Sequence, residues 1–171
     1  MRLTVLGLST FILVGCASDD HERPELRAAL DRATIDLRDS VGVALNEVGS
    51  TVALRAKLVM TDDPVFSVGA LDEEDLKDVR IDLATGRVVS TATVGSTLDP
   101  CEGTIPLSQA LVIAEEAASG DAIAVAPDDD VECAREIQVL SGIILYEVKV
   151  ARDGDVLEQE LSDEYSGEDD D

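Results

Sequence analysis

The sequence predicts an α+β fold made of two repeats, each a helix packed on an antiparallel β-meander sheet. Apolar residues recur at three- and four-residue spacing in some segments, as in helices, and alternate in others, as in half-buried strands. Strand-like segments outnumber helical ones and are joined by short turns, which favours antiparallel pairing. The same order of segments occurs twice, at offsets of 70 and then 80 residues, so we expect two copies of one small unit.

Two helices are predicted at the start of the first repeat. Pro24 suits the first turn of one helix, because it has no N–H to satisfy and its ring fixes a helical φ. Asp36 is expected to cap the other helix through its side chain. Their apolar stripes are Leu26, Ala29, Leu30 and Ala33 in the first helix, and Val41, Ala44, Leu45 and Val48 in the second.

Strands are predicted to complete the first repeat. Apolar residues alternate with small or basic ones over 52–60, which indicates a half-buried strand. A turn is expected at Asp62-Asp63-Pro64. The remaining predicted strands are 65–70 and 79–83, which pair around an acidic loop, and 87–91, which follows a turn at Thr85-Gly86.

The second repeat is predicted to contain one helix and at least three strands. Its helical stripe is Leu107, Ala110, Leu111, Ala114 and Ala117. About ten extra residues between this helix and the central strand are expected to form an insertion. The strands are predicted at 136–139, at 143–151 after Ser141-Gly142, and at 156–161 after Asp153-Gly154, a strong hairpin signal.

Composition excludes several classes of function. The protein of 171 residues has 37 acidic and 13 basic residues and a formal charge of −24. Phosphate binding needs Lys and Arg, so this charge argues against nucleic-acid binding. Aromatic residues make up 2% and there is one histidine, His21, so we expect neither a stacking platform nor a histidine-based catalytic or metal site. We predict that the protein is not an enzyme and uses no cofactor.

The first residues have the pattern of an export signal. Arg2 is followed by a largely apolar, uncharged stretch over 3–14, too short for a permanent membrane span. It ends in Leu13-Val14-Gly15-Cys16, which resembles the lipobox of bacterial lipoproteins. The resemblance implies a signal peptide over 1–15 and a diacylglycerol anchor on Cys16. An ordinary signal with a chance cysteine is the alternative.

The lipobox resemblance also implies a location. Residues 16–23 are expected to form a polar tether between the membrane and the folded part. The protein is therefore expected in the bacterial cell envelope, facing the periplasm or the surface. Ala17, rather than Asp, follows Cys16, which favours the outer membrane.

Two further cysteines, Cys101 and Cys133, remain after lipid attachment. An exported compartment is oxidising, and an even number of remaining thiols predicts a disulfide between them. Such a bond would join the predicted insertion to the start of the helix in the second repeat. A metal or redox pair is the alternative, but the 31 intervening residues and the lack of a nearby His make no ligand motif.

Acidic clusters allow three interpretations. They form a solvated surface, they bind a cation, or they form a face for a basic partner. Calcium needs six or more oxygens around it, and none of the clusters has the alternating acidic spacing with a central glycine of an EF-hand. We therefore predict no metal site. The weak candidates are Asp128, Asp129, Asp130 and Glu132, with further clusters at 72–75 and 168–171.

Short motifs in the two predicted repeats occur in a common order. The first repeat has Val65-Phe66-Ser67-Val68 and a strand over 81–88 that includes Thr85-Gly86; the second has Leu107-Ser108-Gln109-Ala110 and Tyr146-Glu147-Val148. This pattern resembles the PepSY family over most of residues 35–167. The first repeat departs from it at Phe66-Ser67, where the family has an aromatic-Glu pair, and the second lacks a clean Thr-Gly turn.

The PepSY resemblance implies two domains, 24–95 and 96–171, the second with an acidic tail. Family members occur in propeptides of thermolysin-type metalloproteases and in secreted or envelope proteins, and have no catalytic residues to transfer. The expected function is that of a lipid-anchored, non-catalytic envelope protein that binds or inhibits a secreted peptidase through a sheet edge or its acidic surface. The alternative is an extracytoplasmic lipoprotein that binds a cation or another ligand through acidic loops.

Overall fold

The computed structural model describes residues 23–96, 101 and 103–165. Three helices and eight strands lie in this described part of the protein. Each of the two longer helices is followed by four strands. The elements are α1 (Pro24–Leu30), α2 (Leu37–Val48), β1 (Ala53–Val59), β2 (Val65–Asp72), β3 (Asp75–Asp82), β4 (Val88–Ser96), α3 (Leu107–Ala118), β5 (Asp121–Pro127), β6 (Arg135–Ser141), β7 (Ile144–Val150) and β8 (Val156–Leu161).

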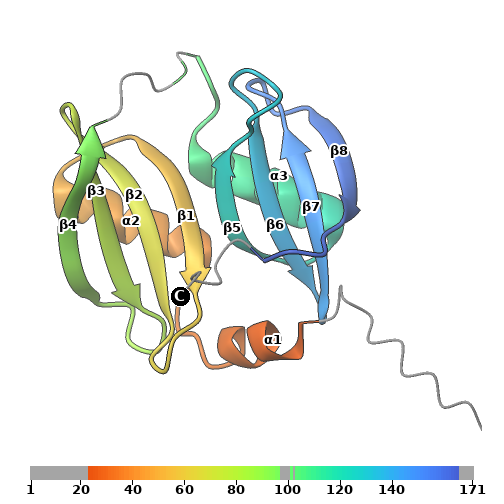
Figure 1. The fold of residues 1–171 in the computed structure, drawn as a ribbon, viewed down its shortest axis with the longest axis horizontal. Coiled ribbons are helices and arrows are strands. Elements are labelled where there is room, and N and C mark those ends of the chain that lie inside the picture. The colour runs from red at the N-terminus through yellow and green to blue at the C-terminus, as the bar shows by residue number, and fades with distance from the viewer. Residues whose placement is uncertain (1–22, 97–100, 102, 166–171) are drawn as a thin grey trace, which may run out of the picture.

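All eight strands form one antiparallel sheet in the order β4-β3-β2-β1-β5-β6-β7-β8. Helices α2 and α3 lie side by side on one face of this sheet (Figure 1). Helix α2 packs on β1 to β3, and α3 packs on β5 to β8. We call α2 with β1–β4 the N-terminal half and α3 with β5–β8 the C-terminal half.

The prediction of two repeats, each with a helix on its own sheet, is wrong. Strand β1 pairs with β5, with Ala56 opposite Val125 and Lys57 opposite Ala124, so the sheet is continuous through the molecule. We call this pairing the seam. Sequence reasoning missed β5 because four consecutive residues, Ala122 to Val125, are buried and show no alternation. The mixture of helices and strands is as expected, and the domain boundary between residues 95 and 96 stays a prediction.

Helices α1 and α2 begin where the sequence predicts, at Pro24 and after Asp36, but α1 ends at Leu30, before Ala33 of its predicted stripe. The Asp36 carboxylate accepts a hydrogen bond from the Asp39 N–H at 2.6 Å, which satisfies one of the free amides in the first turn of α2. Gly49 ends α2 in the left-handed conformation, at φ 68°. Helix α3 begins after Pro106 without a side-chain cap, and Ser119 ends it at φ 54°.

Several strands run further than expected. The predicted acidic loop between 70 and 79 is a tight turn, because β2 and β3 pair up to Asp72 and Asp75, with Leu71 opposite Leu76. Strand β4 continues to Ser96 rather than ending at residue 91. In β1 the register shifts between Ala53 and Arg55, so Ala53 is buried and the alternation predicted from Leu54 is broken.

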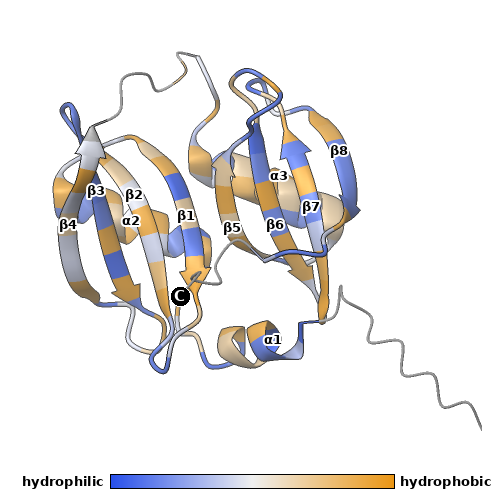
Figure 2. Cartoon of the chain, viewed as in Figure 1, coloured by the Kyte–Doolittle hydropathy of each residue, from blue (hydrophilic) through white to orange (hydrophobic). Residues whose placement is uncertain are grey.

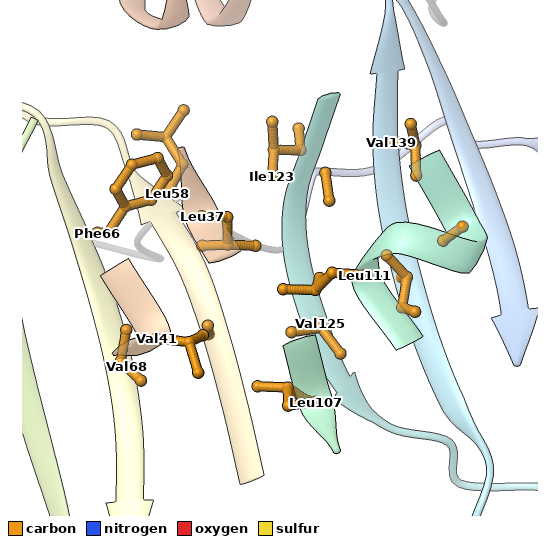
Figure 3. Packing of buried hydrophobic residues seen from close by; sticks show 14 of the residues in the cluster. Leu37, Val41, Leu58, Phe66, Val68, Leu107, Leu111, Ile123, Val125 and Val139 are labelled. Atoms are coloured by element: carbon orange, nitrogen blue, oxygen red, sulfur yellow. The ribbon is translucent and has the colours of Figure 1, made fainter. Parts of the chain in front are cut away.

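Apolar side chains between the sheet and the helices form one core that reaches across the seam. Leu37 and Val41 of α2 lie over Phe66 and Val68 of β2, and Leu111 of α3 lies near Val125 and Val139 (Figure 3). Burying such side chains stabilises a fold by about 1.5–3 kcal/mol each. The largest fully buried residues include Phe66, Leu37, Leu58, Leu111 and Ile123. The core therefore ties both halves together.

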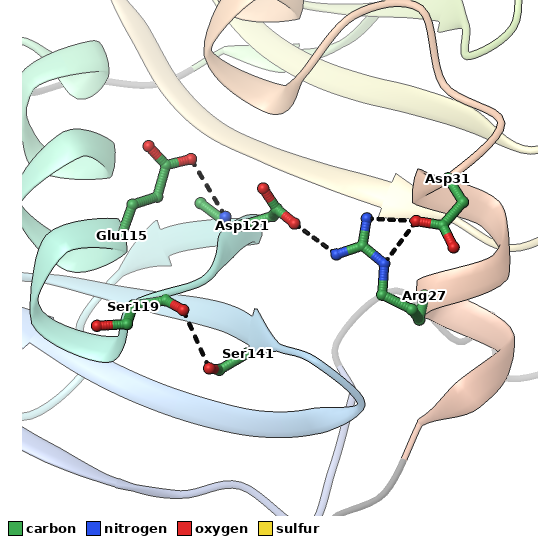
Figure 4. A network of polar contacts seen from close by, with 7 residues as sticks. Arg27, Asp31, Glu115, Ser119, Asp121 and Ser141 are labelled. Carbon is green, nitrogen blue, oxygen red and sulfur yellow. Dashed lines mark hydrogen bonds and ion pairs between the residues drawn. The ribbon is translucent and has the colours of Figure 1, made fainter.

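Helix α1 fastens the two halves at one end of the sheet (Figure 1). Arg27 forms ion pairs with Asp31 at 2.8 Å and with Asp121 of β5 at 2.6 Å (Figure 4). These pairs raise the pKa of Arg27, the hydrogen bond from Arg27 to Asp121 most of all. The Arg23 N–H donates to the Ile143 carbonyl at 2.6 Å, so the first described residue lies against the C-terminal half.

Candidate protein-binding edges

Strands β4 and β8 are the two ends of the sheet, and each pairs with one neighbour within the described residues. An edge strand has backbone N–H and C=O groups that can pair with another polypeptide. Partner proteins use such edges by adding an extended segment as a further strand. The two edges are therefore candidate binding sites in a protein that is expected to bind other proteins.

Strand β4 has no charged residue over its whole length, Val88 to Ser96. Natural edge strands usually carry charges or prolines that block pairing with other polypeptides, and 29% of this sequence is charged. Figure 2 shows β4 without the blue of charged residues, whereas β8 carries blue. The absence of charge leaves the outer backbone of β4 open to pairing.

Two exposed valines mark the ends of the regular part of β4. The pairing with β3 skips Val89 and Val94, which therefore lie in β-bulges. Their side chains are 57% and 50% exposed. Between them Ser90 to Thr93 pair without interruption with β3. Because bulges bend an edge and discourage long pairings, this edge suits a short partner segment of about four residues.

The β8 edge is acidic. Glu158 and Glu160 alternate along it, and its exposed apolar residues are Val156, Leu157 and Leu161. Glu160 lies directly opposite Glu147 of β7, on the face of the sheet away from the helices. Inward or edge charges of this kind oppose the addition of a further strand unless that strand is basic.

A carboxylate cluster continues inward from β8. Glu147 has its pKa raised to about 7, first by burial, then by the neighbouring carboxylates Glu136 and Glu160, against the opposing effect of Lys149. Lys149 also forms ion pairs with Glu158 at 3.7 Å and Asp128 at 3.4 Å. Lys149 is thus the cation beside several carboxylates. The outer face of the C-terminal half therefore keeps an excess of negative charge.

The weak metal candidates lie in the turn between β5 and β6, and Asp128 stabilises this turn by hydrogen bonds. The Asp128 carboxylate accepts hydrogen bonds from the N–H groups of Asp130 at 2.9 Å and Val131 at 2.6 Å. Burial would raise the pKa of Asp128, but these hydrogen bonds and Lys149 outweigh it and lower the pKa. Asp129 and Glu132 are exposed on the same turn. Across residues 23–96, 101 and 103–165, no three acidic, His or Cys side chains gather as metal ligands.

The predicted disulfide joins Cys101 to Cys133, with their Cα atoms 5.6 Å apart. Cys133 lies at the end of the β5–β6 turn, and Cys101 precedes α3. The bond therefore links that turn to the segment leading into the helix, as the sequence indicated. Cys16, the signal peptide and most of the tether lie outside the described residues.

A cleft opens where the two halves part at one end of the seam. It has a volume of about 430 Å³ and is lined by residues of β1, β5 and β6 and by the segment before α3. Arg135 reaches into its lining and donates a hydrogen bond to the Ile105 carbonyl at 2.9 Å. Sequence reasoning missed Arg135, because its neighbours in the sequence form no recognisable motif. The small number of basic residues in the C-terminal half could have drawn attention to it.

No protein-family model and no curated protein matches the sequence. Among solved structures, it is similar to a crystal structure of a candidate lipoprotein from Clostridium difficile 630, with 18% identity and a TM-score of 0.46 over 76% of this protein and 95% of that one. It is also similar to the C-terminal domain of YpeB from Bacillus megaterium, with 18% identity and a TM-score of 0.30 over 76% and 67% of the two proteins. Likenesses at these scores assign neither a family nor an activity.

Within the described residues, no helix has the length and apolar composition of a membrane span.

Proposed function

We propose that the protein is a lipid-anchored, non-catalytic binding protein of the bacterial cell envelope, which holds a short extended segment of a partner at the β4 edge. The observation that carries the proposal is the open, uncharged strand β4 with its two exposed bulge valines. Backbone hydrogen bonds supply most of the affinity in strand addition, so such a site needs no special constellation of side chains.

The neutrality of β4 distinguishes it from β8. A partner strand beside β8 would place its side chains near Glu158 and Glu160, which disfavours most sequences. Beside β4, Val89 and Val94 can cover apolar side chains of the partner, and no charge has to be desolvated. We therefore assign the binding role to β4.

The place where the expected tether joins the folded part also supports β4. Cys16 lies seven residues before Arg23, and Arg23 is held by Ile143 in the C-terminal half. Six strand spacings, about 29 Å at 4.8 Å each, separate β7 from β4 in the sheet order. A lipid on Cys16 would therefore join the folded part at the C-terminal half, away from β4 in the sheet order.

The partner is proposed to be a secreted peptidase, on the basis of the sequence resemblance to the PepSY family. Binding at β4 would hold or inhibit it at the membrane surface. The acidic loops do not favour the cation-binding alternative, because Asp128 already caps a turn and pairs with Lys149.

A pair of matched double variants tests this proposal. Val89→Glu with Val94→Glu adds two charges to β4, and Val156→Glu with Leu161→Glu adds two to β8. All four residues are exposed, so we expect each pair to change stability by less than about 1 kcal/mol. Affinity for the partner, and any inhibition of secreted proteolysis, should fall at least tenfold in the β4 variant and stay within twofold in the β8 variant. Equal effects of the two variants would contradict the assignment of β4.

A further inference from the structure

The seam between the halves is closed at one end and open at the other. Its two residue pairs, Ala56–Val125 and Lys57–Ala124, are followed at one end by Leu58, whose carbonyl accepts a hydrogen bond from the buried Tyr165 hydroxyl. At the opposite end β1 and β5 part, and the cleft of about 430 Å³ lies there. The two halves therefore leave an accessible space at this junction.

The walls of the cleft are mainly apolar. Its volume falls in the range of about 300–1,000 Å³ that small-molecule sites occupy. The disulfide fixes one wall, because both of its cysteines line the space. The apolar lining includes Val52, Leu54, Ile105, Leu107, Pro127 and Ala134.

Arg135 is the cation of this cleft. Its guanidinium donates to one backbone carbonyl, that of Ile105, and among the described residues no carboxylate lies within ion-pair distance of it. Burial lowers its pKa, and no neighbouring charge opposes that effect. Because residues 93–171 contain 21 acidic residues and three basic ones, an arginine without an ion pair to any described acid is unexpected.

The other charged residue of the lining is already neutralised. Asp128 accepts two backbone hydrogen bonds and pairs with Lys149 at 3.4 Å. Among the described residues of the lining, the net charge left for a ligand is therefore that of Arg135. A guanidinium offers planar, two-pronged hydrogen bonding that matches a carboxylate.

We propose that the seam cleft binds a small organic acid with a short apolar body, whose carboxylate pairs with Arg135. The apolar body lies against the walls formed by β1 and the segment before α3. This site is independent of the β4 edge, so it stands or falls apart from the proposed function.

The probes are N-acetyl-leucine and its uncharged amide, which differ in the carboxylate alone. Calorimetric titration of the full-length protein should show saturable binding of the acid, and binding of the amide should be at least tenfold weaker. A pentapeptide that ends in leucine is titrated beside them. Tighter binding of the peptide identifies the carboxyl terminus of a polypeptide as the natural source of the carboxylate, and equal or weaker binding identifies a free small acid.

Three variants locate the binding. Arg135→Gln should weaken binding of the acid at least tenfold, and Arg80→Gln, which removes an exposed guanidinium from β3, should leave it within twofold. Thr51→Trp at the exposed rim of the cleft keeps Arg135 and should also abolish binding, which covers the case that Arg135→Gln disturbs the fold. The proposal is overturned if neither the acid nor the peptide binds saturably at millimolar concentration, or if Arg80→Gln and Arg135→Gln weaken binding equally.

Discussion

The N-terminal and C-terminal halves share one sheet and one core but differ in how their charges are balanced. Residues 24–92 contain 13 acidic and 8 basic residues, whereas residues 93–171 contain 21 and 3. In the N-terminal half, Lys77 pairs with Asp75 at 3.1 Å and Arg80 with Asp78 at 3.2 Å. In the C-terminal half, Glu147 faces Glu160 directly.

This difference explains why the two edges are not equivalent. Paired charges on β3 allow the neighbouring edge β4 to stay neutral, while carboxylates in excess of their basic partners extend to the outermost strand β8. A strongly acidic protein can therefore stay soluble through one half and keep the other available for contact. Substitutions in each half should show how far the halves are distinct and how far they unfold as one unit. The expected changes in unfolding free energy range from several kcal/mol to less than about 1 kcal/mol.

The strongest test of unity is a core truncation in the N-terminal half. Phe66→Ala removes a fully buried ring and should cost about 3–5 kcal/mol of unfolding free energy. Tyr146 of β7 reports on the C-terminal half, and Tyr165 reports on the contact with Leu58 of β1. Because the core is shared, urea unfolding followed by tyrosine fluorescence and by far-UV circular dichroism should give one coincident transition at a lower midpoint. Two separate transitions would show that the halves unfold independently; Phe66→Leu serves as the milder control.

Removing the disulfide tests a bond made by the β5–β6 turn of the C-terminal half. The double variant Cys101→Ser with Cys133→Ser opens a loop with a sequence separation of 32 residues, and the loop-entropy estimate gives a loss of about 3–4 kcal/mol. The urea midpoint of the variant should fall accordingly. Titration of the unreduced wild-type protein should find neither of these two thiols free, and finding both free would contradict the bond.

The hydrogen bond from Tyr165 to Leu58 links the C-terminal segment to β1 across the seam. Tyr165→Phe removes this hydroxyl from a buried site and should cost about 1 kcal/mol. Tyr146→Phe, on β7, is the matched control and should change stability less. If the two variants are equally stable, the seam is not held by this contact.

The carboxylate cluster should make stability depend on pH. The raised pKa of Glu147, about 7 against an ordinary 4.5, means that the folded protein keeps a proton that the unfolded state releases. Stability should therefore fall as pH rises from 4.5 through 7. Because Glu147 is partly exposed and screened, we expect an effect below about 1 kcal/mol.

Glu147→Gln isolates this contribution. The variant should gain stability relative to the wild type above pH 7 and match it below pH 4.5, as measured by thermal unfolding across pH. Glu160→Gln, which keeps Glu147, should lower the pKa of Glu147 in an NMR titration. If Glu147→Gln is no more stable than the wild type at pH 8, solvent screens the repulsion between these carboxylates completely.

Local rules predict local elements in this protein. The Asp36 cap and the helical stripe of α3 each depend on neighbours along the sequence, and the structure contains both helices. Strand β6 is also present, but Gln138, expected on the polar side of its alternation, is buried. The Cys101–Cys133 bond was predicted from the expected export to an oxidising compartment and the even number of remaining thiols.

The features that make the sheet continuous depend on contacts between distant residues. Strand β5 is central and buried, so it lacks the alternation that marks a half-exposed strand, and its pairing with β1 could not be predicted. The bulges at Val89 and Val94 depend on the register with β3, which composition does not encode. Arg135 lines a cleft formed by segments from both halves. It stands out because it forms no ion pair with a described acid, and this depends on the fold rather than on its sequence neighbours.

The central claim is that recognition takes place at the neutral β4 edge. A photoreactive amino acid is placed at Val94 on β4 or, in a second protein, at Leu157 on β8; both positions are exposed bulge residues. Irradiation in the native envelope is followed by mass spectrometry of the linked peptides. The account predicts that position 94 links to a short extended segment of an extracytoplasmic protein, in most samples and in one register, while position 157 does not. Linking of the same partner at position 157, or at neither position, would contradict it.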